Sequence, residues 1–172
     1  MNKAQHLALG AALLLLPAAA SATEIFGGIY KHNVDTPLSL GEGLEGGADF
    51  QLGVRGNGIG GTRIQPHVFG ALNSKGDTSY AAIGVSRKYG RKYYVRPGLG
   101  LAIHDGADDK FNRSDRIAFG SRILFELEAS VGAQVSERVS IEASWVHLSH
   151  ATLFSGQNPG IDNMGARVNV RL

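Results

Sequence analysis

Apolar and polar residues alternate with a period of two along most of the chain beyond residue 23, and no stretch there keeps the 3.6-residue period of an amphipathic helix. The clearest run lies between Ser121 and Gln134, where every second residue from Ile123 to Ala133 is apolar and most of the others are charged or small. Successive side chains of a strand point to opposite faces of a sheet. The pattern therefore predicts an all-β chain whose strands have one apolar and one polar face.

Eight segments show this alternation, and the connections between them are mostly long and short in turn. The segments are residues 24–33, 46–56, 62–73, 78–88, 92–105, 117–134, 137–150 and 162–172. The longer connections are residues 34–45, 106–116 and 151–161, residues 74–77 are a short exception on the same side, and tight turns are expected near residues 57–58, 89–91 and 135–136. Bacterial outer-membrane barrels combine an even number of antiparallel strands with long outer loops and short periplasmic turns. The sequence predicts an eight-stranded antiparallel transmembrane β-barrel.

The charged residues of the segments decide which face lies inside. They share the polar parity: Arg55, Arg96, Arg122, Glu126, Glu128, Glu142, Arg167 and Arg171. A membrane barrel turns its apolar side chains outward and its polar ones inward, so these charges are expected to pair in the lumen. A lipocalin-like soluble barrel is the alternative that the pattern leaves open, but an eight-stranded interior has little room for so many large apolar side chains and a ligand.

The amino terminus resembles an export signal. It has Lys3, an apolar run from Leu7 to Leu16 and small residues up to Ala22, which are the features of a secretory signal peptide. The run is shorter than the roughly 20 apolar residues that a membrane-spanning helix needs. We therefore expect residues 1–22 to be a signal peptide and residues 23–172 to be one outer-membrane barrel domain. The chain has no cysteine, so disulfides do not hold it.

Charge argues against nucleic acid as a partner. The formal net charge is only +2, and the basic residues are scattered beyond residue 23 without a dense cluster. Nucleic-acid binding depends on concentrated positive charge that neutralises phosphates.

Three residues near the end of the chain carry candidate chemistry. In the seventh segment the apolar parity of Trp145 continues into His147 and Ser149, and in the eighth the apolar parity reaches back to Asp162. Side chains two positions apart on a strand lie about 6–7 Å apart on the same face, and the next strand brings a carboxylate beside them. A serine nucleophile, an imidazole base and an orienting carboxylate form an ester-hydrolysing site. Asn158 is a candidate oxyanion donor.

Each of these residues also has a structural interpretation that involves no catalysis. His147 and Ser149 also fit a strand that ends where water returns, and Asp162 and Asn158 fit the turn around Pro159. His150 has the opposite parity and is expected at the mouth of the lumen. The remaining histidines, His32, His67 and His104, lack the spacing of a metal site and are expected to pack inside the barrel, so we predict neither a metal nor a cofactor.

The segment from Trp145 to Asp162 resembles the outer-membrane lipid A 3-O-deacylases of the PagL type, a group of acyloxyacyl-hydrolase-like barrels. Members of that family carry a His-x-Ser-Asn motif and then a loop that ends in an Asn-x-Gly-Ile-Glu-like stretch. His147, Ser149 and Asp162 match the catalytic positions in order. His150 stands where the family has Asn, Asp162 replaces Glu, and the loop is one residue longer.

The resemblance implies an activity and its partners. The substrate would be the 3-O-linked acyl chain of lipid A in lipopolysaccharide, released as a 3-hydroxy fatty acid without a metal or cofactor, and outer-membrane lipids would surround the protein. A homodimer is left open. The alternatives are a phospholipid esterase and a small barrel with a structural or binding role and no activity.

Overall fold

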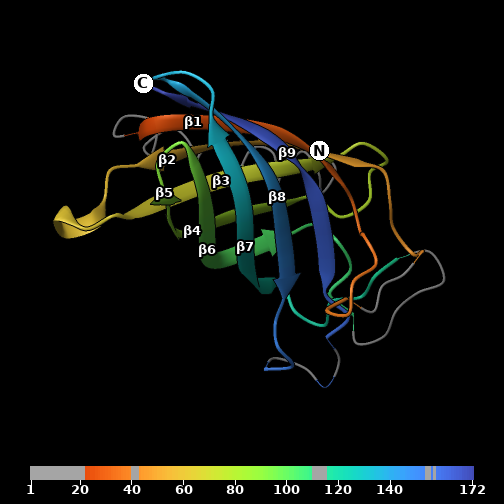
Figure 1. Ribbon diagram of the computed structural model, residues 1–172. Helices are drawn as coiled ribbons and strands as arrows, with labels where there is room; N and C mark the ends of the chain where they lie inside the picture. Colours follow the sequence, from red (N-terminus) through yellow and green to blue (C-terminus); the bar gives the residue numbers. More distant parts are fainter. Residues whose placement is uncertain (1–21, 40–42, 110–115, 154–155, 157) are drawn as a thin grey trace.

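The chain folds into an antiparallel β-barrel with longer loops at one end (Figure 1). The computed structural model describes residues 22–39, 43–109, 116–153, 156 and 158–172. In these ranges it has a short 3-10 turn, η1 (Ile59–Gly61), and nine β-strands. The strands are β1 (Ala22–Lys31), β2 (Ala48–Gly56), β3 (Ile64–Asn73), β4 (Tyr80–Arg87), β5 (Tyr89–Gly90), β6 (Tyr93–His104), β7 (Ile123–Gln134), β8 (Val139–Ser149) and β9 (Ile161–Arg171). None of the helical structure in these ranges has the length and hydrophobicity to cross a bilayer.

The sheet closes on itself. Strands β1 to β4 pair antiparallel in sequence order, and so do β6 to β9. Strand β4 pairs with β6, and β1 pairs with β9. The two residues of β5 extend the β4–β6 hairpin and pair only with β6. Strand β5 is therefore not a separate strand of the barrel wall. The barrel has eight strands, as the alternation predicts.

One strand boundary differs from expectation by more than two residues. The sixth predicted segment begins at residue 117, whereas β7 begins at Ile123. Residues 117–119 are buried outside the strand, and the backbone N–H of Phe119 donates to the carbonyl of Ala107, 2.9 Å away, because this loop folds back over the barrel. The predicted signal peptide lies outside the described residues except for Ala22, with which β1 begins, so that expectation stays a prediction.

The outer surface of the barrel is apolar. Ile29, Phe50, Leu52, Ile83, Leu99, Val131, Ile141 and Val168 are all exposed on strands whose alternate residues are buried and mostly polar. This is the orientation of an outer-membrane barrel, with hydrocarbon outside and polar groups within. It excludes the soluble-barrel alternative, in which the apolar set would face inward.

Ion pairs fill the middle of the lumen. The guanidinium of Arg167 lies between two carboxylates, with Nη2 2.5 Å from Glu128 Oε1 and Nε 2.5 Å from Glu142 Oε2. The second oxygen of Glu142 accepts from Arg96 Nε at 3.0 Å. All four side chains are buried. Each charge therefore has a partner of opposite sign, which offsets the cost of removing it from water.

Two arginines expected in the lumen lie outside it. Arg122 is exposed and pairs with Asp108 at 2.6 Å, and Arg171 is exposed at the end of β9. Both have the inward parity, but they stand at strand ends, where inward positions open to water.

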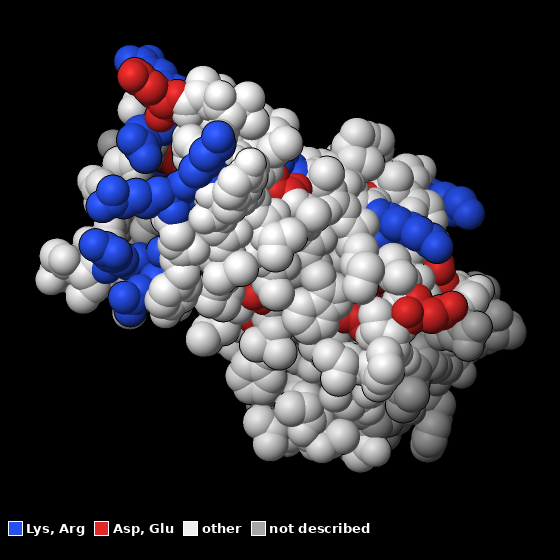
Figure 2. Space-filling model, viewed as in Figure 1, with Lys and Arg blue, Asp and Glu red and all other residues white. Residues whose placement is uncertain are grey.

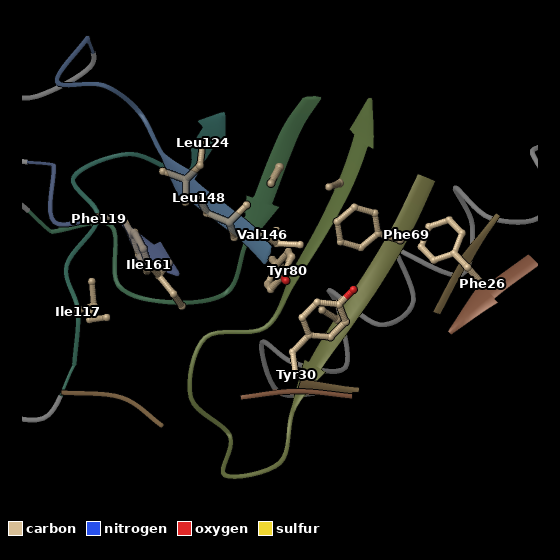
Figure 3. Close-up of a cluster of buried hydrophobic side chains, with 13 residues drawn as sticks. Phe26, Tyr30, Phe69, Tyr80, Ile117, Phe119, Leu124, Val146, Leu148 and Ile161 are labelled. Carbon is tan, nitrogen blue, oxygen red and sulfur yellow. The ribbon is translucent and has the colours of Figure 1, made fainter. Parts of the chain in front are cut away.

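The loop end of the interior is apolar, which the alternation did not predict. Leu124, Val146, Leu148 and Ile161 have inward parity and are fully buried. Figure 3 shows them at one end of the buried cluster, with Ile117 and Phe119 from the β6–β7 loop beside them. This packing holds the loop ends of β7, β8 and β9 together and directs their alternate side chains outward.

Candidate active site

Strands β8 and β9 bring the three predicted residues together at their loop ends. His147 pairs with Asp162 across the β8–β9 ladder, and Ser149 lies two residues farther along β8. Val146 and Leu148 are buried inside the barrel, so the residues between and after them, His147 and Ser149, have the outward parity. Directly opposite residues in an antiparallel pair are close enough for side-chain contact.

The three side chains form a continuous hydrogen-bonded chain. His147 Nδ1 lies 2.9 Å from Asp162 Oδ1, and His147 Nε2 lies 2.9 Å from Ser149 Oγ. The carboxylate can only accept, so Nδ1 carries the proton and Nε2 accepts from the serine hydroxyl. This is the tautomer that a general base needs, because its free lone pair points at the nucleophile.

The carboxylate of Asp162 has two further donors. The indole Nε1–H of Trp145 donates to Oδ1 at 2.7 Å, and the Thr36 hydroxyl donates to Oδ2. The Trp145 ring also stacks on the His147 ring at 5.8 Å between centroids. The apolar parity of Trp145 did not indicate its contact with Asp162. Thr36 lies 126 residues from Asp162, and no sequence pattern connects the two.

Loops cover these residues even though their parity is outward. His147 is 5% exposed, Ser149 8% and Asp162 0%. The β1–β2 loop crosses the start of β9, where the backbone N–H of Val34 donates to the carbonyl of Asp162 at 2.7 Å. Gly160 has φ +62°, and a Cβ there would lie 3.1 Å from His147 Cε1. The site is therefore shielded from bulk water, which strengthens its electrostatic interactions.

Asn158 lies beside the chain segment that carries Ser149. Its Oδ1 accepts from the backbone N–H of His150, 2.9 Å away, so its Nδ2 is the side-chain atom that can donate. His150 itself is fully buried. Asn158 stays a candidate oxyanion donor.

An apolar groove runs along the outer wall below the site. Its volume is about 550 Å³, and its lining includes Val95, Pro97, Ala129, Ala143, Trp145 and Met164. The small side chains of Ala129 and Ala143 form part of its wall, and Trp145 belongs to both the groove and the site. The mostly apolar lining of the groove suits an alkyl chain, and Trp145 connects the groove to the hydrogen-bonded residues.

The other predicted interior histidines are buried, and His32 holds the loops together. Its Nδ1 lies 2.9 Å from Asp49 and its Nε2 3.1 Å from Glu45. Burial alone would lower the pKa of His32, but the two carboxylates outweigh it and raise that pKa to about 9. Glu45 also accepts from the backbone N–H groups of Thr78 at 3.0 Å and Ile117 at 3.2 Å. One carboxylate thus ties three outer loops to one another.

Comparison with known proteins shows likeness in both sequence and fold. The model of the family described as Lipid A 3-O-deacylase (PagL) matches residues 30–171. The crystal structure of the outer membrane enzyme PagL aligns with a TM-score of 0.62 at 13% identity, over 87% of this chain and 99% of that one. Neisserial surface protein A aligns with a TM-score of 0.51, also at 13% identity, over 87% of this chain and 96% of that one. No curated protein matches the sequence.

Proposed function

Because the chain belongs to the lipid A 3-O-deacylase (PagL) family, we propose that it removes the 3-O-linked acyl chain of lipid A with Ser149 as nucleophile, His147 as general base and acid, and Asp162 as orienting carboxylate. The proposal rests on one observation, the continuous hydrogen bonding of Asp162, His147 and Ser149. The two hydrogen bonds are each 2.9 Å long.

The reaction follows from this arrangement. Ser149 Oγ attacks the ester carbonyl carbon as His147 Nε2 takes the hydroxyl proton, and Asp162 stabilises the imidazolium that forms. The tetrahedral intermediate expels the sugar oxygen, which receives the proton from His147. Water then attacks the acyl-serine ester, with His147 again as base, and releases the 3-hydroxy fatty acid. The Nδ2 group of Asn158 is the proposed donor to the oxyanion.

The position of the site supports a substrate that arrives from the membrane. His147 and Ser149 have the outward parity, and the apolar groove on the same wall suits the acyl chain. The long-loop end of a bacterial barrel faces the cell exterior. Lipid A in the outer leaflet would therefore meet the site sideways, with its sugars toward the loops and its acyl chains along the groove.

Replacing Ser149 or His147 by alanine tests the assignment. Each variant is expected to lower acyl-chain release from lipid A by at least about a thousandfold, as removal of a serine hydrolase nucleophile or base does. Mass spectrometry of lipid A measures the release, and heat-modifiable migration on a gel shows that the barrel is folded.

Ser140→Ala is the matched control, because Ser140 lies on the same strand with the opposite, buried parity. It is expected to keep full activity. Undiminished release by Ser149→Ala would overturn the assignment. Wild-type protein that cleaves a diacyl glycerophospholipid and leaves lipid A intact would instead identify a phospholipid esterase, and no release from either substrate would favour a non-enzymatic barrel.

A further inference from the structure

Positive charge gathers at the turn end of the barrel, opposite the candidate active site. Figure 2 shows blue side chains crowded at the end where the chain terminates. We call the exposed arginines and lysine of this end the basic collar, which consists of Arg63, Arg87, Arg91, Lys92, Arg138 and Arg171. Among the described residues of the turns, Glu137 is the exposed acid in this region. The carboxylate of Glu24 points into the lumen, where it pairs with Arg55 and Arg96.

At the loop end, the described acidic and basic side chains nearly balance. Its described exposed or half-buried acids are Asp35, Asp77, Asp105, Asp108 and Asp109, against the cations Lys31, Lys75, Arg116 and Arg122. Arg122 is already paired with Asp108. The net charge of +2 for the whole chain therefore conceals a separation of charge along the barrel axis. Like charges held close together repel one another, so the collar is stabilised by an anionic partner.

Tyrosines set the depth of the collar. Tyr89 and Tyr93 are 48% and 72% exposed beside the β4–β6 turn. The Arg87 guanidinium lies 4.7 Å from the Tyr89 ring centre, and Lys92 Nζ lies 5.8 Å from that of Tyr93. Tyrosines of membrane proteins are enriched at the level of the lipid headgroups. Cations next to them are therefore at the depth of lipid phosphates rather than farther out in the periplasm.

The collar also surrounds a hollow. It has a volume of about 810 Å³ between the β4–β6 and β7–β8 turns, and its charged lining residues are the cations Lys88, Arg91, Lys92 and Arg171 and the acid Glu137. Lys88 is held in place by a hydrogen bond to Gln134 Oε1 at 2.9 Å and by the Tyr94 ring, whose centre is 3.8 Å from its Nζ. A phosphate at the edge of this hollow would meet several donors at once.

We propose that the basic collar binds the anionic phospholipid headgroups of the periplasmic leaflet. The short-turn end of a bacterial outer-membrane barrel faces the periplasm, and that leaflet is made of phospholipids. Basic residues near an anionic bilayer surface each contribute to attraction, and the effect falls off within a Debye length. The collar would hold the turn end at the phosphate level while the loop end works in the opposite leaflet. This inference does not depend on the proposed catalytic residues.

Native mass spectrometry of the full-length folded barrel tests the proposal. The protein in detergent micelles is titrated with phosphatidylglycerol or phosphatidylcholine of identical acyl chains, and the retained lipid is counted. Wild type is expected to retain phosphatidylglycerol preferentially. The double variant Arg91→Gln/Lys92→Gln is expected to weaken that retention, by about fivefold per cation removed at low salt, and to leave phosphatidylcholine retention unchanged.

The double variant Lys31→Gln/Lys75→Gln is the matched control, because it removes the same charge from exposed lysines of the loop end. It is expected to retain phosphatidylglycerol as wild type does. Equal retention of both lipids by wild type would overturn the proposal, and so would equal losses in the two double variants. Co-sedimentation with purified peptidoglycan that depends on Arg91 and Lys92, without lipid selectivity, would also overturn it by identifying a different partner.

Discussion

The carboxylate of Asp162 lies at the centre of the candidate site, because three donors from two separate segments reach it. They are His147 and Trp145 from β8 and Thr36 from the β1–β2 loop. Family members have glutamate at the position that Asp162 matches, and the shorter side chain here still reaches His147 at 2.9 Å. The β8–β9 register, in which the two residues lie directly opposite, accounts for this reach.

Asp162→Asn tests the orienting role. The amide can donate to His147 Nδ1, which moves the imidazole proton to Nε2 and removes the acceptor that Ser149 needs. Lipid A deacylation is expected to fall by about a thousandfold or more, as measured by the rate of fatty-acid release. Asp35→Asn removes an exposed carboxylate from the neighbouring loop and is expected to be active. Activity of Asp162→Asn equal to wild type would exclude the role.

Thr36→Val tests whether the loop threonine positions Asp162. The substitution keeps the shape and removes a hydrogen bond to a charged group, an interaction worth about 1.5–3 kcal/mol. We expect kcat to fall about tenfold with KM unchanged, whereas Thr36→Ser should restore wild-type kcat. Trp145 is the single tryptophan of the chain, so its fluorescence shows whether the loop still docks. A valine variant with normal kcat, or a serine variant as impaired as valine, would contradict this role.

The outer loops are joined to one another by a buried charge cluster rather than by strand pairing. Glu45 contacts His32, Thr78 and Ile117, which come from different loops or strand ends. The β1–β2 loop that carries Glu45 also carries Thr36, so the order of this cluster bears on the candidate site. Alternation does not predict such contacts, because it describes strands and has no information on how loops fold over them.

The charge of His32 predicts a pH dependence of the loops. Its pKa is raised from 6.5 to about 9 in the folded protein, so its stabilising contribution is fully present below pH 6.5 and is lost as the pH rises through about 9. Hydrogen exchange of residues 32–39, corrected for intrinsic rates, is expected to show falling protection between pH 7 and 10. His32→Gln should have low protection without that pH dependence. Identical pH profiles for the two proteins would show that His32 does not hold the loop.

The closed sheet divides the molecule into three environments. The outer wall is apolar, the middle of the lumen is ion-paired, and the loop end of the interior is an apolar cluster. The alternation predicted the first two. The apolar cluster at the loop end was not predicted. Ile117 and Phe119 cover the inward positions there and exclude water from them, so Leu124 and Leu148 are buried in apolar surroundings.

Arg167→Met tests how far the luminal ion pairs stabilise the barrel. Removing the Arg167 guanidinium leaves the buried carboxylate of Glu128 without its cation. Loss of one partner from a buried ion pair lowers the free energy of unfolding by about 3–5 kcal/mol. Urea unfolding in micelles, followed by the loss of heat-modifiable migration, should show a decrease of that size. Arg171→Met, at an exposed position of the same strand, is expected to change stability by less than about 0.5 kcal/mol. Equal stability of the two variants would contradict the stabilising role of the pairs.

The amino-acid pattern was sufficient to predict the strand alternation, the number of barrel strands, the outward apolar face and the parity of His147, Ser149 and Asp162. Side-chain direction along a strand is a local property with a period of two, so a linear pattern can encode it. The contacts of Thr36 and Trp145 with Asp162, the departure of residues 117–122 from the strand and the exposed positions of Arg122 and Arg171 became evident in the folded structure alone. Those outcomes depend on how loops distant in sequence pack over the barrel ends, and no periodic pattern along the chain encodes that packing.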